Sequence, residues 1–271
     1  MHPLGDRWWR SSFLFIKVLY VRSFESAACP PSEQVCAAPA VATTGQVDIP
    51  AYLSQTYWWA YLHPNAVRLF ERQWLVNLIL WGNFARLRDA ALAELGSASS
   101  PLEGNVLQVA CVYGNFTEQL VRRLSPRAHL TVVDVAPIQV DNLHRKLGSH
   151  PQVSVLRQDS TALQLADASQ DAVVLFFLLH EQPADVRRQT LAEAWRVTKP
   201  GGKLVVVDYH RPSALHPLYL PMMAVLKTLE PFALDLWRAD LTSWLPPGAQ
   251  PASLTRHTRF GGLYQQVVMV R

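Results

Sequence analysis

The sequence is poor in cysteine, in charge and in long apolar runs. Its three cysteines, Cys29, Cys36 and Cys111, show no spacing typical of a zinc site or a disulfide framework, which favours a reducing, cytoplasmic compartment. Only 17% of the residues are charged and the net charge is +4, without lysine-rich runs, so we expect no nucleic acid partner. No apolar run reaches the roughly twenty residues that a membrane-spanning helix requires.

The sequence is instead rich in hydrophobic and aromatic residues. Hydrophobic residues make up 49% of the 271 residues and tryptophan occurs nine times, which indicates a globular chain rather than a disordered one. A mildly basic surface with many aromatic side chains also suits contact with an anionic membrane. The length fits one α/β domain of ordinary size with an additional layer.

Residues 1–48 differ from the rest of the chain. A basic, aromatic stretch, RWWRSSFLFIKVLYVRSF, precedes a segment rich in Ala, Pro, Ser and Thr, which is typical of a linker. We therefore predict a flexible leader over residues 1–48, with an interfacial membrane anchor as the alternative. A cleaved signal peptide is less favoured, because Lys17 interrupts the apolar stretch.

Residues 49–100 form an aromatic segment for which we predict helices. The pattern from Asn65 to Leu95 is helical, and a proline and a glycine bound it. Trp74 to Ala85 contains no charged residue, which leaves two interpretations. The helix is either buried against a sheet, or it lies at the surface and inserts apolar side chains into lipid or covers an apolar substrate. The side chains concerned are Trp74, Leu75, Leu78 and Trp81.

Residues 101–271 alternate between apolar, strand-like segments and amphipathic, helix-like segments. The strand-like segments include NVLQVAC, AHLTVVDVA, QVSVLRQDS, QDAVVLFFLLHE and KLVVVDYH. This alternation predicts an α/β fold with a doubly wound, mostly parallel sheet. Residues 212–245 are apolar and proline-rich, and we interpret them as an inserted helical lid over a lipid-soluble substrate, with a further core helix as the alternative.

Acidic residues follow two of the predicted strands. Asp134 ends the second strand about twenty residues after the turn at Tyr113 and Gly114, where an acid can accept hydrogen bonds from both ribose hydroxyls of an adenosine. Asp159 ends the third strand and can meet an adenine amino group, with Ser160 beside it. Helix capping and turn formation are the structural alternatives for the two acids.

The amino-acid sequences of these segments resemble the motifs of a known family. EAWRVTKPGGKLVVVDYHRP, VLQVACVYGNFT and VVDVAPIQVDNLHRKL resemble the motifs of class I S-adenosylmethionine (SAM) methyltransferases, especially the ubiquinone/menaquinone C-methyltransferases. The strings TYWWAYLHPNAVRLFERQWLVNLILWGNFARLRDAAL and FGGLYQQVVMVR are similar to the RquA family of rhodoquinone biosynthesis proteins. That resemblance implies a Rossmann-like fold and the replacement of a ring methoxy group of ubiquinone by an amino group. It also implies SAM as the nitrogen donor and manganese as the assisting metal.

The first cofactor loop departs from the methyltransferase pattern. The chain has Gln108 where the family carries an acid, and Ala110 and Val112 where it carries glycines, which permit positive φ. A differently engaged SAM amine is consistent with these changes, and simple decay of the loop is the alternative. The cofactor-binding residues that the resemblance implies are Gln108, Ala110, Cys111, Tyr113, Gly114, Asn115, Asp134, Val135, Asp159 and Ser160.

Catalytic candidates lie in the loop and after the fourth and fifth strands. We predict catalytic roles for Tyr113, His180 and Glu181, although Tyr113 could also be a hydrophobic plug. His180, Asp208 and His210 are uncertain candidates for manganese, because histidine and carboxylate suit this metal but no spacing here is a metal signature.

Three functions remain open from the sequence. The first is conversion of ubiquinone to rhodoquinone at a membrane surface to which the protein is peripherally attached. The second is conventional C- or O-methylation of a quinone or its precursor. The third is a non-catalytic SAM-fold subunit of a quinone-biosynthesis assembly. The sequence does not give the oligomeric state.

Overall fold

The computed structural model describes residues 47–97 and 99–271. The predicted leader, residues 1–48, lies outside the described residues except for residues 47 and 48. Within the described ranges, every helix is too short or too polar to cross a bilayer. The division at residues 49 and 101 stays a prediction.

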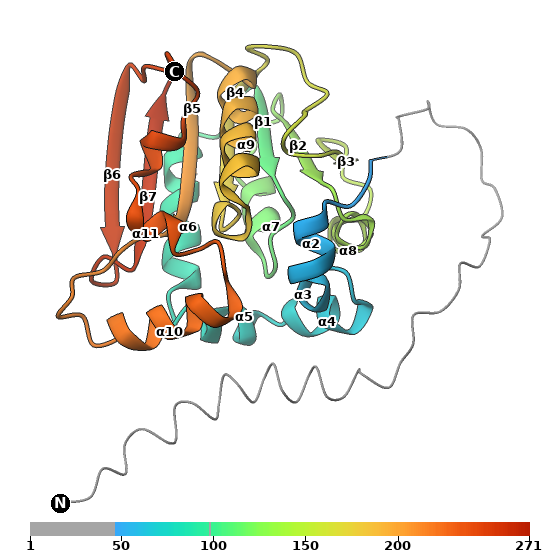
Figure 1. The fold of residues 1–271 in the computed structure, drawn as a ribbon. Helices are drawn as coiled ribbons and strands as arrows, with labels where there is room; N and C mark the ends of the chain where they lie inside the picture. The colour runs from blue at the N-terminus through green and yellow to red at the C-terminus, as the bar shows by residue number, and fades with distance from the viewer. Residues whose placement is uncertain (1–46, 98) are drawn as a thin grey trace, which may run out of the picture. The chain divides into compact units, whose positions relative to one another are not determined.

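One sheet of seven strands organises residues 101–271, with the order β3-β2-β1-β4-β5-β7-β6 (Figure 1). The first five strands pair in parallel, whereas β7 runs antiparallel to both β5 and β6. This arrangement confirms the predicted doubly wound, mostly parallel α/β fold. The strands are β1 (Asn105–Val109), β2 (His129–Asp134), β3 (Val153–Arg157), β4 (Gln170–Phe176), β5 (Thr198–Tyr209), β6 (Ser253–Arg259) and β7 (Tyr264–Val270).

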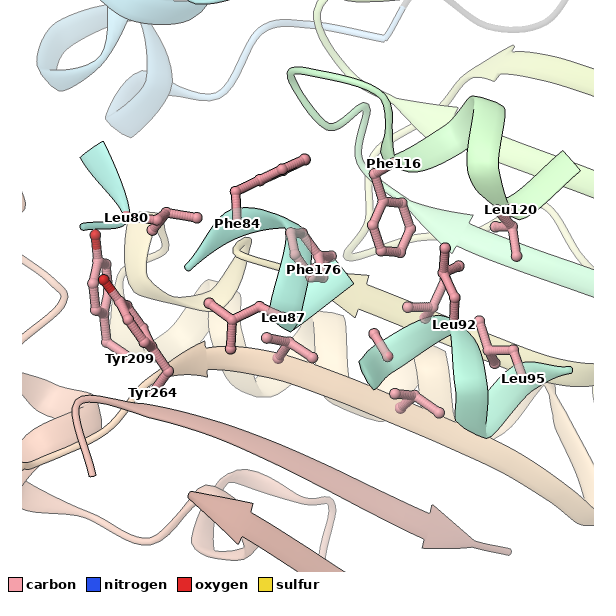
Figure 2. Packing of buried hydrophobic residues seen from close by; sticks show 14 of the residues in the cluster. Leu80, Phe84, Leu87, Leu92, Leu95, Phe116, Leu120, Phe176, Tyr209 and Tyr264 are labelled. Carbon is pink, nitrogen blue, oxygen red and sulfur yellow. The ribbon is translucent and has the colours of Figure 1, made fainter. Parts of the chain in front are cut away.

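Helices cover the sheet on both faces because its central strands are apolar on both faces. One core cluster joins the sheet to α6 (Phe84–Leu95), α7 (Phe116–Val121), α8 (Pro137–Leu147) and α10 (Tyr219–Leu229). Figure 2 shows part of this cluster around Phe84, Phe116 and Phe176. A second cluster joins the other face to α9 (Ala184–Val197), α11 (Asp235–Arg238) and the short helix η2 (Leu241–Trp244).

The segment before the sheet is helical, but the single helix predicted from Asn65 to Leu95 is wrong. It is divided into α4 (Pro64–Phe70), α5 (Gln73–Ile79) and α6, and is preceded by α2 (Ala51–Thr56) and α3 (Trp58–Tyr61). The break before α6 occurs because Trp81 and Gly82 adopt φ values of 52° and 77°, which no α-helix accommodates. The chain therefore turns sharply at Trp81, and α5 and α6 are separate helices.

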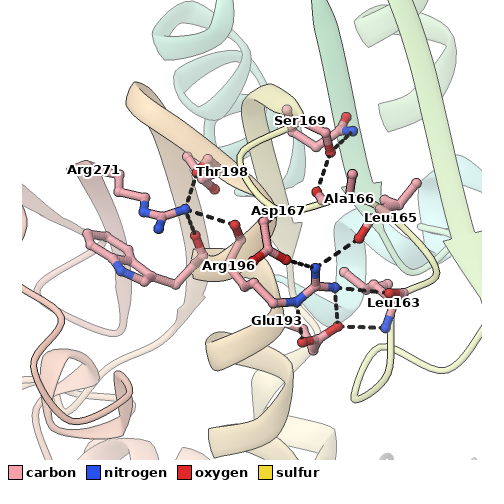
Figure 3. A network of polar contacts seen from close by, with 11 residues as sticks. Leu163, Leu165, Ala166, Asp167, Ser169, Glu193, Arg196, Thr198 and Arg271 are labelled. Atoms are coloured by element: carbon pink, nitrogen blue, oxygen red, sulfur yellow. Dashed lines mark hydrogen bonds and ion pairs between the residues drawn. The ribbon is translucent and has the colours of Figure 1, made fainter.

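Polar contacts tie together the end of the sheet where β5 begins (Figure 3). Arg196 contacts Glu193, Asp167 and the carbonyl oxygens of Leu163 and Leu165. Arg271 donates to the carbonyl oxygens of Trp195, Arg196 and Thr198. These contacts stabilise the amino-terminal side of the parallel strands and leave the carboxyl ends for ligands.

Candidate functional site

The loop after β1 retains a glycine-type conformation without the glycine. Ala110 has a φ of 72° and Gly114 a φ of 77°, whereas Val112 is not among the residues with positive φ. Val112 stands where the methyltransferase pattern has a glycine, but it needs no positive φ, because the backbone takes another path there. Ala110 instead adopts the left-handed conformation, which costs a residue with a Cβ about 1–2 kcal/mol.

Gln108 lies at the base of this loop and is fully buried. Its Nε2 donates to the Ala110 carbonyl oxygen at 2.9 Å, while its Oε1 has no hydrogen-bond partner. An acid at this position would place a negative charge under the loop. Gln108 offers a neutral acceptor there instead, and a bound amine could donate to it.

Asp134 ends β2 and its carboxylate reaches the first loop. Oδ2 accepts from the backbone N–H of Cys111 at 2.7 Å, and Oδ1 accepts from that of Ala136 at 2.8 Å. Burial raises the pKa of Asp134 to about 6, although these backbone N–H groups favour the charged form. The next residue, Val135, accepts at its carbonyl oxygen from Arg157 Nε at 3.2 Å. A carboxylate fixed between the loop and α8 can accept hydrogen bonds from ribose hydroxyl groups.

The other end of the loop is held by α5, α6 and α8. The Asn115 N–H donates to Gln73 Oε1 at 3.2 Å, and Asn115 Oδ1 accepts from Arg88 at 2.6 Å. Lys146 donates to the Gly114 carbonyl oxygen. A Cβ at Gly114 would lie 3.0 Å from Gln73 Oε1, so both space and φ require glycine here.

Asp159 and Ser160 follow β3 and make mainly local contacts. Asp159 Oδ1 accepts from the backbone N–H and the hydroxyl of Thr161, both at 2.8 Å, which is an Asx turn. Ser160 Oγ lies 2.9 Å from Thr190 Oγ1 and accepts from Gln182 Nε2 at 3.2 Å. Asp159 therefore stabilises its own turn through Oδ1, and Oδ2 takes no part in these two hydrogen bonds.

Tyr113 is fixed by its neighbours. Its ring stacks with those of Tyr61 and Phe70, with both pairs of ring centroids 5.6 Å apart. Its hydroxyl donates to the Ala60 carbonyl oxygen at 2.7 Å and accepts from Gln139 at 2.6 Å. This environment is that of the hydrophobic plug described above, and a catalytic role for Tyr113 stays a prediction.

His180 and Asp208 form a buried pair at the carboxyl ends of β4 and β5. His180 Nδ1 lies 3.0 Å from Asp208 Oδ1, and Asp208 Oδ2 accepts from the backbone N–H groups of Leu179 and His180. Burial lowers the pKa of His180, but the Asp208 carboxylate outweighs burial and raises this pKa above its ordinary value. The pair therefore holds a proton on the imidazole.

Glu181 lies beside this pair on the short helix η1 (Leu179–Glu181). Its Oε1 lies 3.7 Å from His180 Nε2 and accepts a hydrogen bond from the Tyr61 hydroxyl. Burial raises the pKa of Glu181, and the opposing effect of His180 is smaller. A carboxyl group with a raised pKa can exchange a proton near neutral pH, as general acid–base chemistry requires.

Three residues that sequence reasoning missed position this centre. Arg187 is fully buried and donates to the carbonyl oxygens of Leu179, Gln182 and Phe232. These bonds join η1 to the segment between β5 and β6. Phe177 has a φ of 55° and turns the chain after β4. Tyr61 reaches Glu181 from α3. An arginine in an amphipathic helix and an aromatic residue at a strand end carry no sequence signal of such roles.

His180, Asp208 and His210 are engaged in hydrogen bonds within the protein. The Asp208 carboxylate already accepts four hydrogen bonds, from three backbone N–H groups and His180. His210 Nδ1 lies 2.8 Å from the Gly262 carbonyl oxygen. Within residues 47–97 and 99–271, no group of three or more His, Cys, Asp or Glu side chains is placed to hold a metal ion. These contacts do not support the metal assignment, which stays a prediction.

Comparisons with known proteins find sequences similar to the central part of this chain. A family model described as a methyltransferase domain matches residues 106–202. The chain is 38% identical to the demethylmenaquinone methyltransferase of Deinococcus radiodurans, over 47% of this chain and 51% of the relative. It is 28% identical to the ubiquinone/menaquinone biosynthesis C-methyltransferase UbiE of Pseudomonas aeruginosa, over 52% of this chain and 54% of the relative. The chain thus spans about half the length of these relatives.

Solved structures support the fold. A protein from Nostoc punctiforme that is assigned as an O-methyltransferase matches with a TM-score of 0.54 at 16% identity, over 80% of this chain and 63% of that one. At this identity the likeness shows the architecture alone.

Proposed function

We propose that the protein is a SAM-dependent transferase acting on a lipid-soluble quinone, because residues 106–202 match a methyltransferase-domain family model and the chain is similar to quinone methyltransferases over about half of its length. The observation that carries the proposal is the junction of Asp134 with the first loop, since it offers an adenosine-binding carboxylate beside the loop. The names of the two relatives support a quinone as the substrate.

SAM would be held by the first loop and the strand ends. Asp134 would accept from the ribose, the loop from Ala110 to Gly114 would face the methionyl part, and Asp159 and Ser160 would face the adenine. When bound, SAM supplies either an electrophilic methyl group or an amine. The protein residues bind and orient it and exclude water.

The centre formed by His180, Glu181 and Asp208 would move protons. Asp208 orients the imidazole through Nδ1, so that Nε2 is directed toward Glu181. Glu181 would take a proton from the reacting group at its carboxylate oxygen, and the neighbouring imidazolium would stabilise the charge that remains.

Two groups are candidates for transfer, and methyl transfer is the one that the relatives support more directly. Their printed names describe methyltransferases of quinone biosynthesis. In this version the protein is a conventional methyltransferase acting on a quinone or a quinone precursor.

Amino transfer is the second candidate, and the base of the first loop favours it. Gln108 presents a neutral acceptor where an acid would pair with the SAM ammonium group. An amine without an ionic partner loses its proton more readily and becomes nucleophilic. Addition of this amine to the ring and loss of methanol would give a covalent adduct of SAM and the quinone. Cleavage of the bond between the nitrogen and the SAM carbon would then release rhodoquinone.

One labelling experiment separates the two transfers. Purified protein is incubated with ubiquinone and SAM that carries heavy nitrogen in its amine or heavy carbon in its methyl group, and the quinone products are analysed by mass spectrometry. Heavy nitrogen in the product establishes amino transfer, and heavy carbon establishes methyl transfer. A protein that binds no SAM in calorimetry would instead be a non-catalytic subunit, and the proposal would be overturned.

Attachment to a membrane surface belongs to the proposal, because a lipid-soluble quinone resides in the bilayer. Trp74 and Leu78 on α5 are 59% and 52% exposed, and Leu220 on α10 is 67% exposed. Arg72 and Lys227 are exposed on the same two segments. Apolar side chains with neighbouring cations suit an anionic lipid surface.

A further inference from the structure

Two tyrosines lie opposite each other on the antiparallel strands β5 and β7. Tyr209 ends β5 and Tyr264 begins β7, and they are partners in the strand register. Their ring centroids lie 5.7 Å apart. Figure 2 shows the two hydroxyl groups side by side and pointing the same way. Both side chains are buried, with exposures of 6% for Tyr209 and 0% for Tyr264.

The Tyr264 hydroxyl has no hydrogen-bond partner. A buried hydroxyl without a partner destabilises a fold, and each such group in a native protein calls for an explanation, of which a ligand is one. A phenylalanine would fill the same space without this penalty. A tyrosine at this position is therefore explained if its hydroxyl bonds a group that arrives from outside the chain.

The ring of Tyr209 adjoins the proton-transfer centre, and the ring of Tyr264 lies next to it. The Tyr209 ring packs edge-on against His180, with centroids 4.9 Å apart. Phe177 packs edge-on against both tyrosines, at 5.5 Å from Tyr209 and 5.8 Å from Tyr264. A flat ring bound near these hydroxyls would thus lie beside His180 and among aromatic rings, whose edges and faces favour such packing.

We propose that Tyr264 and Tyr209 donate hydrogen bonds to a ring oxygen of the quinone substrate and so set its orientation beside His180. This inference rests on the proposed function for the identity of the substrate. A quinone carbonyl is a hydrogen-bond acceptor without a proton of its own, so it matches two phenolic donors. The donors would also polarise the carbonyl and make the conjugated ring carbons more electrophilic.

The test uses decylubiquinone in detergent and the variants Tyr264→Phe and Tyr209→Phe, with Thr255→Val as the control for loss of a hydroxyl group elsewhere. Thr255 is exposed on β6, the edge strand of the sheet. Quinone affinity is followed by quenching of tryptophan fluorescence, and the carbonyl stretch of the bound quinone by infrared difference spectroscopy. Calorimetry measures SAM binding in the same samples.

Each of Tyr264→Phe and Tyr209→Phe should weaken decylubiquinone binding by roughly 3- to 12-fold, the value of one hydrogen bond, and should reduce the downshift of one carbonyl stretch. SAM affinity should match the wild type in every variant, and quinone binding by the Thr255→Val variant should match the wild type as well. A Tyr264→Phe variant with unchanged quinone affinity and an unchanged infrared band would overturn the inference, while wild-type binding of the quinone would leave the proposed function standing. Failure of the wild type to bind any decylubiquinone would count against both.

Discussion

The Nδ1 atom of His180 lies 3.0 Å from Oδ1 of Asp208, and both side chains are buried. The same carboxylate accepts from the backbone of η1, so one acid fixes both the imidazole and the helix that carries it. Substitution of Asp208 therefore affects chemistry and stability together.

Asp208→Asn should reduce the rate of transfer to the quinone by about 10²- to 10⁴-fold, the range for general acid–base groups. It should also destabilise the fold by about 3–5 kcal/mol, because a buried charged network loses one partner. Stopped-time product assays and urea denaturation measure the two effects. Asp171→Asn is the control, since Asp171 is half-exposed and pairs with Lys199; a rate loss of equal size in both variants would contradict the role of Asp208.

Stability should fall as pH rises between about 4 and about 8 because of Glu181. Burial raises the pKa of Glu181 to about 8, so its proton is held more tightly in the folded state than in the unfolded one. Such a group contributes stability fully below its unfolded pKa, near pH 4, and loses this contribution as pH rises through about 8. Thermal melts from pH 5 to pH 9 should show a smaller decline in Glu181→Gln than in the wild type. Parallel curves for the two proteins would show that Glu181 does not titrate in this range.

Asp134→Ala should weaken SAM binding by about 1.5–3 kcal/mol, the range for a hydrogen bond to a charged group. Asp171→Ala is the control, because Asp171 is half-exposed at the start of β4 and pairs with Lys199. Calorimetry on both folded variants measures the affinities. Unchanged affinity in Asp134→Ala would reject its assignment to the ribose.

Ala110→Gly should stabilise the protein by up to about 1 kcal/mol. Glycine removes the cost of the left-handed conformation at φ 72°, and the greater entropy of the unfolded chain offsets part of the gain. Val112→Gly should destabilise by about 0.5–1 kcal/mol, because Val112 needs no positive φ and glycine only adds unfolded-state entropy. Urea titrations of both variants provide the check, and equal effects of the same sign would disprove the conformational explanation.

Trp74→Ser combined with Leu78→Ser should reduce binding to anionic vesicles while leaving the melting temperature nearly unchanged, because both side chains are more than half exposed. Trp81→Ser should destabilise the fold instead, since Trp81 packs on the core and its Nε1 lies 3.1 Å from Met222 Sδ. Vesicle flotation beside thermal melts separates the outcomes. Leu254→Ser, on the exposed strand β6, is the control for nonspecific loss of an exposed apolar group.

The sequence predicts the sheet well because each strand is a short, continuous apolar run, and burial on both faces imposes that pattern. The break at Trp81 is not predictable from periodicity, because a tryptophan in the left-handed region keeps the apolar spacing of a helix. Asp134 is predictable from its place after a strand. Tyr61, Arg187 and Tyr264 are not, because their roles arise from tertiary contacts between segments far apart in the chain.

The segment between β5 and β6 runs along the length of the strands, from the carboxyl end of β5 back to the end where β5 begins. It leaves after Tyr209, which pairs with the first residue of β7, and it returns at Ser253, which pairs with the last, Val270. Arg187 and Arg188 on α9 pack over the ring of Trp244 near its far end, at 4.7 Å and 4.8 Å. Anchored in this way at opposite ends, the segment is a strap rather than a hinged flap. A protease cut within it would therefore leave two pieces that stay associated.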